Sequence, residues 1–179
     1  MLGCTPKGRH TEQHDIFFGI GGAIKDLKQD IIDFWPEAKG KIHLDAFREV
    51  TNVDGYEITV VPADEAVESP FKLFFLNLGG YKEDQFEELH YKVLTVSDTK
   101  AGAIKQAKQT AFYKHCGFKG ATSHIDDKYG VDVDDIYEIG DILPAGLKSN
   151  YKLQISPAEG LPMDKIHLGY FILNKLDDL

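Results

Sequence analysis

An internal repeat constrains the fold of this chain more than any other feature, because a duplicated sequence predicts a duplicated structural unit. Two blocks recur 76 residues apart, Leu2-Gly3 as Leu78-Gly79 and Glu12-x-His14 as Glu88-x-His90. Further along, HLDAFREVTNVDGYEI begins at His43 and HIDDKYGVDVDDIYEI begins at His124, and the two strings align without a gap. Because all the matches keep the same order, we expect two related units in one chain.

The repeat predicts where the modules of the chain begin and end. We place the first module at residues 1–61, a linker at 62–70, the second module at 71–143 and a partial third repeat at 149–179. The linker, PADEAVESP, combines prolines with acidic residues, as surface connections do. FKLFFLN precedes Leu78 in the second module but only Met1 precedes Leu2, so we expect the first strand of the first module to be truncated.

Hydrophobic periodicity predicts a β-β-α-β-β order in each module. FKLFFLN, LHYKVLTV and HDIFFGI have the apolar content of strands, and IKDLKQDIIDFW carries its apolar residues at helical spacing. The strings that contain His43 and Tyr56 flank NVDG, a turn sequence, and predict a hairpin whose second-module turn spans residues 132–135. We therefore expect an α+β fold, in which helices pack on mostly antiparallel sheets and the partial third repeat adds two strands.

Composition and charge disfavour several classes of protein. The 179 residues include 20 Lys and Arg against 29 Asp and Glu, a net charge of −9, so repulsion from phosphates makes nucleic-acid binding unfavourable. No apolar run reaches the roughly 20 residues of a membrane helix, and the first residues lack the pattern of a secretory signal. Two cysteines cannot build a disulfide framework. These features predict a soluble protein of the cytoplasm with no membrane partner.

Three stretches of the sequence, MLGCTPKGRHTEQHDIFFGIG, FFLNLGGYKEDQFEELHYKV and FKGATSHIDDKYGVDVDDIYEI, resemble a bacterial family. The family is domain of unknown function 1543, whose members similar to this chain carry the domain once or twice. The resemblance extends over most of residues 1–143, and the Leu-Gly…Glu-x-His and His-x-Asp strings are its most specific part. It implies no activity, substrate or cofactor, so the function must be inferred from the residues themselves.

Paired histidines and carboxylates are the strongest candidates for a functional site. Residues two apart on a strand face the same way, so Glu12 pairs with His14 and His43 pairs with Asp45. If the two strands are neighbours, two imidazoles and two carboxylates converge, and they can hold a divalent metal ion or act in acid–base chemistry. His10 adds a third imidazole nearby. The second-module equivalents are Glu88, His90, His124 and Asp126.

A structural role for the same residues is the alternative. A histidine at the start of a strand commonly bonds a carboxylate or a carbonyl and orients a turn, and a duplicated unit duplicates that contact as well. His167 favours the structural interpretation, because Lys165 stands where its partner glutamate is expected. The sequence leaves both interpretations open.

Two further motifs have a functional and a structural interpretation. Cys4 lies in an expected loop near an arginine and two histidines, where a cation lowers a thiol pKa and favours a nucleophile; otherwise it is a small buried thiol. The glycine-rich stretch at 19–22 lies between an expected strand and an expected helix. Such a stretch either cradles a phosphate or forms a tight connection.

Two functions from different classes follow. The first is a non-catalytic binding or interaction module, which the duplication and the lack of a complete catalytic motif favour, and which requires no cofactor. The second is a metal-dependent hydrolase that uses the His/carboxylate set, with water activated by a divalent metal and a carboxylate as base. Unpaired sheet edges in the first and third modules favour a homodimer. The sequence identifies no ligand or other partner.

Overall fold

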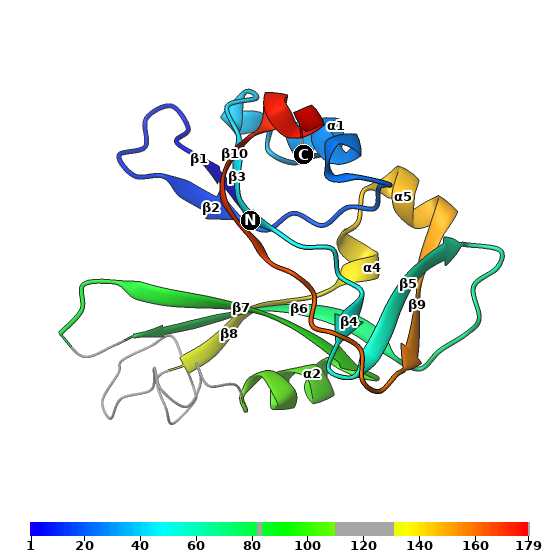
Figure 1. The fold of residues 1–179 in the computed structure, drawn as a ribbon. Coiled ribbons are helices and arrows are strands. Elements are labelled where there is room, and N and C mark those ends of the chain that lie inside the picture. Colours follow the sequence, from blue (N-terminus) through cyan, green and yellow to red (C-terminus); the bar gives the residue numbers. More distant parts are fainter. Residues whose placement is uncertain (82–83, 110–130, 179) are drawn as a thin grey trace. The chain divides into compact units, whose positions relative to one another are not determined.

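The structure of the protein, a computed structural model, describes residues 1–81, 84–109 and 131–178 (Figure 1). The chain forms two compact units, each built from more than one segment. Unit 1 contains residues 1–51, 143–151 and 162–179, and unit 2 contains residues 52–142 and 152–161. The part of the chain after residue 142 contributes to both units.

Unit 1 contains a four-stranded antiparallel sheet. Its strands are β1 (Leu2–Cys4), β2 (Gln13–Asp15), β3 (His43–Phe47) and β10 (His167–Ile172), in the order β10-β3-β1-β2. Its helices are η1 (Ile24–Leu27), α1 (Lys28–Phe34), η2 (Pro36–Ala38), α5 (Ala145–Asn150) and η3 (Leu173–Asp178). Gly3 of β1 is in register with His14 of β2 on one side and with His43 of β3 on the other.

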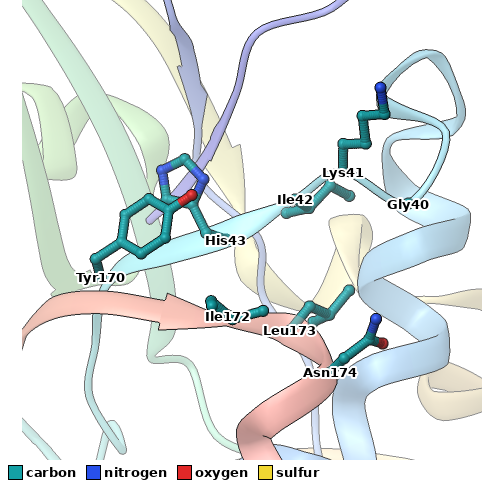
Figure 2. Close-up of a pocket in the computed structure, with 8 residues that line it drawn as sticks. All are labelled: Gly40, Lys41, Ile42, His43, Tyr170, Ile172, Leu173 and Asn174. Carbon is teal, nitrogen blue, oxygen red and sulfur yellow. The ribbon is translucent and has the colours of Figure 1, made fainter.

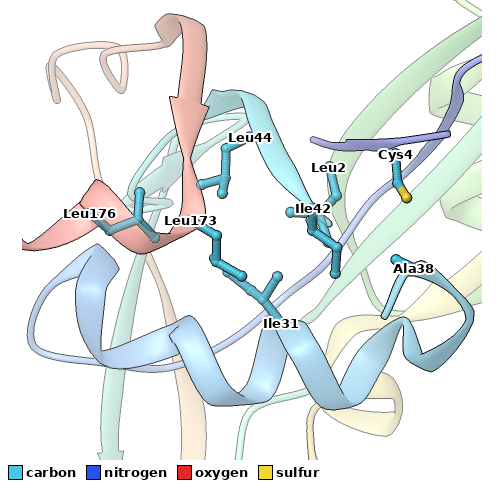
Figure 3. Packing of buried hydrophobic residues seen from close by; sticks show 8 residues of the cluster. All are labelled: Leu2, Cys4, Ile31, Ala38, Ile42, Leu44, Leu173 and Leu176. Atoms are coloured by element: carbon cyan, nitrogen blue, oxygen red, sulfur yellow. The ribbon is translucent and has the colours of Figure 1, made fainter. Parts of the chain in front are cut away.

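The two faces of this sheet differ, because side chains alternate along each strand. The hydrophobic core of unit 1 includes Leu2, Cys4 and Leu44 from the sheet, Ile31 from α1, and Leu173 and Leu176 from η3 (Figure 3). The helical spacing predicted for residues 24–34 is confirmed in η1 and α1, which pack on this core. Gly3, His43 and Asp45 alternate with the core residues of β1 and β3. The core therefore fixes the strands that carry the candidate site residues.

Unit 2 contains two three-stranded sheets. In one, β6 (Lys72–Tyr81) lies between β7 (Glu88–Ser97) and β8 (Val131–Glu138); in the other, β5 (Tyr56–Pro62) lies between β4 (Asn52–Val53) and β9 (Tyr151–Pro157). The helices α2 (Lys100–Ala107) and α4 (Ile139–Ile142) belong to the same unit. Ala103 and Ala107 of α2 pack against Leu76 and Leu78 of β6, and their small side chains allow a close approach.

The two units share a β-β-α-β order among the residues that the structure describes. The elements are β1, β2, α1 and β3 in unit 1 and β6, β7, α2 and β8 in unit 2. In both, the first strand lies between the other two, and neighbouring strands are antiparallel. This mixture of helices and antiparallel sheets confirms the α+β prediction. None of the described helices is long and apolar enough to cross a membrane.

The predicted hairpin forms with a different partner strand. Asp54 and Gly55 have positive φ angles of 55° and 81°, and they join β4 to β5 in a two-residue turn. β3, which begins at His43, lies in another sheet. The prediction that the His43 and Tyr56 strings pair with each other was therefore wrong, since Tyr56 pairs with Val53 of β4.

Two other local predictions were wrong. Residues 132–135, expected as a turn, lie within β8, where Val133 packs against the core that β6 and α2 share. The strand expected over residues 14–20 ends at Asp15. Beyond it, Phe17 packs edge-to-face on Phe34 of α1, with the ring centroids 5.5 Å apart. This segment therefore packs against the helix and does not extend the strand.

The segment expected as a partial third repeat supplies one strand to each of two sheets. β9 lies beside β5, and β10 pairs with β3. These two strands are therefore not neighbours, whereas β1 and β2 pair with each other, as do β6 and β7. The proline and glycine residues between β9 and β10 favour this break.

Candidate functional site

The unit 1 candidates converge above Gly3. His14 and His43 are the register partners of Gly3 on β2 and β3, and Asp45 follows two residues after His43 on the same face. Glu12 stands two residues before His14, just ahead of β2. Because Gly3 has no side chain, the side chains of both flanking strands close over it. A Cβ at Gly3 would lie 2.7 Å from Asp45 Oδ2.

These four residues, which we call the unit 1 cluster, form a closed ring of alternating imidazoles and carboxylates. His14 Nε2 lies 3.5 Å from Glu12 Oε2 and 3.4 Å from Asp45 Oδ2. His43 Nε2 lies 3.1 Å from Glu12 Oε1 and 3.2 Å from Asp45 Oδ1. Each carboxylate therefore faces both imidazoles and presents a different oxygen to each.

His43 is the buried member of the unit 1 cluster. Only 8% of its side chain is exposed, against 42% for His14. His43 Nε2 and Asp45 Oδ2 are buried without a hydrogen-bond partner, although both lie within 3.4 Å of an oppositely charged or ionisable group of the cluster. Tyr170 of β10 lies against the imidazole, with the ring centroids 4.1 Å apart (Figure 2). His43 Nε2 is thus buried between carboxylate oxygens of Glu12 and Asp45 without a hydrogen bond to either.

The distances around the ring of the unit 1 cluster resemble those between neighbouring ligands of a metal ion, although among the described residues the group whose ligand atoms all lie within 4.8 Å of one another is Glu88, His90 and Asp134. Nε2 of a neutral imidazole carries at most one hydrogen and cannot donate to two carboxylates equally. Around a tetrahedral ion with bonds of about 2.0–2.2 Å, the ligand atoms stand about 3.3–3.6 Å apart. The four nitrogen–oxygen distances of 3.1–3.5 Å are close to that range. A shared ion would draw one oxygen of each carboxylate toward the centre of the ring.

A smaller cluster lies on the first β-β pair of unit 2. His90 is the register partner of Gly79, the same relation as in unit 1. His90 Nε2 lies 3.9 Å from Glu88 Oε2 and 3.3 Å from Asp134 Oδ2. We call Glu88, His90 and Asp134 the unit 2 cluster. One ligand atom from each of the three lies within 4.8 Å of the other two, a separation that allows them to share an ion.

Asp134 is a site candidate that the sequence analysis missed. The predicted second-module residues His124 and Asp126 lie outside the residues that the structure describes. On β8 the register partner of Gly79 is Asp132, and Asp134 stands two residues further along. The alternating Val-Asp-Val-Asp sequence of β8 is the signal that identifies this strand, but the Tyr-Glu-Ile match placed the alignment elsewhere.

The other sequence candidates lie apart from the two clusters. Cys4 is 1% exposed in the unit 1 core, and burial raises the pKa of its thiol; the Glu12 carboxylate adds to this rise, and Lys41 opposes it. A raised pKa is the opposite of what an activated nucleophile needs. His10 is exposed between β1 and β2, and among the described residues no ion pair joins it to the cluster. Residues 19–22 lie within the connection from β2 to η1.

A cavity of about 220 Å³ opens beside His43 (Figure 2). Its lining comes from the residues that lead into β3, from the second half of β10 and from the start of η3. The lining residues are Gly40, Lys41, Ile42, His43, Tyr170, Ile172, Leu173 and Asn174. The cavity offers room for a small molecule next to one imidazole of the unit 1 cluster.

Comparison with known proteins supports the family resemblance and the fold. Residues 9–60 match the family model of Domain of Unknown Function (DUF1543), which confirms the resemblance inferred from the sequence; all four residues of the unit 1 cluster lie in this range. Among solved structures, the chain is similar to protein Il1583 from Idiomarina loihiensis, with 23% sequence identity, 96% of this chain and 93% of that chain covered, and a TM-score of 0.55. At this identity the likeness shows the fold alone. No curated protein matches the chain.

Proposed function

We propose that this chain is a metal-binding protein whose unit 1 cluster holds one divalent transition-metal ion. His43 carries the proposal, because its buried Nε2 has no hydrogen-bond partner and lies within 3.2 Å of an oxygen from each of two carboxylates. A purely structural histidine has its buried nitrogen bonded, since an unsatisfied buried polar atom costs about 1–3 kcal/mol. Glu12 and Asp45 supply the negative charge that a divalent ion requires.

Binding without catalysis fits this donor set best. Structural zinc sites have four protein ligands, whereas catalytic sites keep three and leave the fourth position to water or substrate. The unit 1 cluster offers four donors, two imidazoles and two carboxylates. We therefore favour the non-catalytic binding module expected from the sequence, working in the cytoplasm, with the metal ion as its ligand.

The cavity beside His43 favours a second candidate function, metal-dependent hydrolysis. If one carboxylate left the ion to act as general base, three protein ligands would remain and a water molecule would take the open position. Glu12 suits the role of base better than Asp45, because 41% of its side chain is exposed against 23%. A substrate small enough for a cavity of about 220 Å³ would then lie next to the ion.

Metal analysis of protein purified without a histidine tag tests the binding proposal. We expect stoichiometric Zn²⁺, Mn²⁺ or Fe²⁺ by elemental analysis. In calorimetric titration of the metal-free protein, Zn²⁺ should bind at least tenfold more weakly to His14→Ala and to Asp45→Asn. His10→Ala is the matched control, because it removes an exposed imidazole outside the cluster. Equal Zn²⁺ affinity in all these proteins would contradict the proposal.

Turnover assays separate the two candidate functions. The metal-loaded protein is incubated with p-nitrophenyl acetate and p-nitrophenyl phosphate. Hydrolysis that is lost in Glu12→Gln while the metal is retained would favour the hydrolase. Full metal occupancy without hydrolysis of either ester favours the binding protein.

A further inference from the structure

The unit 2 cluster gathers donor atoms from two strands that are not neighbours. Glu88 and His90 lie on β7 and Asp134 lies on β8, with β6 between them. Strands two apart in a sheet are separated by about 9.6 Å, so side chains on them meet only by leaning across the strand between. His90 Nε2 nevertheless lies 3.3 Å from Asp134 Oδ2.

Gly79 makes this convergence possible. A Cβ at this position would lie 2.7 Å from Asp134 Oδ1 and closer still to Oδ2, so any other residue would displace the carboxylate. The backbone of Gly79 is that of an ordinary strand residue within the ten residues of β6 and does not itself require glycine. Glycine inside a strand weakens it and commonly marks a close approach of another group. Here the group that approaches is Asp134.

A register shift in β8 aims Asp134 at the same place. Asn77 of β6 pairs with Asp135 and Leu78 pairs with Val133, so Asp134 is an extra residue between two paired ones. A β-bulge of this kind bends the strand and redirects a side chain, and such bulges are common beside functional sites. The glycine on β6 and the bulge on β8 are independent features, and both serve to bring Asp134 into the cluster.

Glu88 has its own support within unit 2. A side-chain hydrogen bond with Glu88 raises the pKa of Tyr81, with burial and the nearby charge of Glu88 as smaller causes. The phenol hydroxyl donates to the carboxylate and restrains its orientation. Outer groups that hold a ligand in this way are typical of metal sites.

We infer that the unit 2 cluster is a second divalent-cation site, which binds harder ions such as Mn²⁺. One imidazole and two carboxylates form a harder donor set than the two imidazoles and two carboxylates of unit 1. The three side chains are partly exposed, so water completes the coordination and the ion exchanges readily. This inference rests on unit 2 residues alone and does not depend on the function proposed for unit 1.

Mn²⁺ binding by the full chain, followed through the electron paramagnetic resonance signal of free Mn²⁺, tests this inference. The double variant Glu12→Gln/His14→Ala removes the unit 1 cluster, and in this background we expect one Mn²⁺ per chain. Adding Asp134→Asn should weaken the binding at least tenfold. Adding Asp135→Asn, the same charge change one residue away, should leave the affinity within twofold of the background protein.

Circular dichroism of each variant establishes that it is folded before its affinity is compared. Gly79→Ala should weaken Mn²⁺ binding at least tenfold, as Asp134→Asn does. If Gly79→Ala does not fold, the affinity of Asp134→Asn alone decides the test. Equal affinities for Asp134→Asn and Asp135→Asn would overturn the inference, as would a folded background protein that binds no Mn²⁺. Unchanged Zn²⁺ binding in the unit 1 variants would contradict the proposed function alone, so the two ideas fail separately.

Discussion

Replacing Gly3 with alanine tests whether the unit 1 cluster depends on the empty space above β1. The added Cβ would lie 2.7 Å from Asp45 Oδ2 and closer still to His43 Nε2, whereas ordinary contact begins at 3.4 Å. The carboxylate must therefore move by about 0.7 Å and the imidazole by more. Asp45 is partly exposed and can turn outward, but His43 is buried against Tyr170. Overpacking of this kind costs about 1–3 kcal/mol.

The expected result of Gly3→Ala has two parts. The unfolding midpoint should fall by about 2–12 °C, because each kcal/mol shifts it by about 2–4 °C in a chain of this length. Zn²⁺ affinity should fall about 10–100-fold, as it does when the surroundings of a metal ligand are disturbed. Scanning calorimetry of the metal-free protein and titration calorimetry with Zn²⁺ measure the two effects. Gly146→Ala is the control, since nothing lies within 4 Å of its added Cβ.

A double-mutant cycle isolates the cause of the destabilisation. In a His43→Ala background the new methyl group of Gly3→Ala no longer meets an imidazole. The substitution should therefore destabilise this background less than it destabilises the natural sequence. Equal destabilisation in both backgrounds, together with unchanged Zn²⁺ affinity, would refute the reasoning, because the empty space above Gly3 would then have no effect on the cluster.

Three further predictions concern the fold around the site. Leu44→Ala should lower the free energy of unfolding by about 2–5 kcal/mol in chemical denaturation, because Leu44 is buried in the unit 1 core. The raised pKa of Cys4 means that the folded state holds the thiol proton more tightly, so its contribution to stability should be full below about pH 8.5 and fall as the pH rises through the folded pKa. Denaturation curves from neutral to alkaline pH should show this loss, and Cys4→Ala should reduce it but leave the loss that comes from Tyr81 and Lys72, whose pKa values are also raised. The homodimer expected from unpaired sheet edges should form through β10, an outer strand with exposed Leu168 and Tyr170. Light scattering should then give twice the 20.0 kDa mass of one chain, and the Leu168→Lys variant should give the mass of one chain.

The pairs within the unit 1 cluster were predictable, but their meeting was not. A spacing of two residues on a strand is enough to place Glu12 with His14 and His43 with Asp45. That the two pairs face each other depends on β1 lying between β2 and β3, which no local pattern specifies. Gly3 only indirectly indicated that side chains close over β1, because a glycine in a short apolar string has many explanations.

In the second module, the sequence alignment and the structure match different residues. Tyr56 belongs to β5, in a different sheet from β3, whereas Tyr137 continues the strand that holds Asp134. The same Tyr-Glu-Ile string therefore occupies different places in the two units. Anchoring the alignment on it draws attention away from Asp134, whose position depends on the register of β8 with β6.

The shortness of β1 gives the unit 1 cluster a consequence beyond ligand binding. β1 contributes only three residues to its sheet, yet both β2 and β3 pair with it. An ion held by the cluster would tie β2 to β3 across β1, and at a concentration of 100 times its Kd it would add about 2.7 kcal/mol to the stability of the fold. Resistance of the chain to proteolysis, and so its abundance in the cell, would then follow the supply of metal.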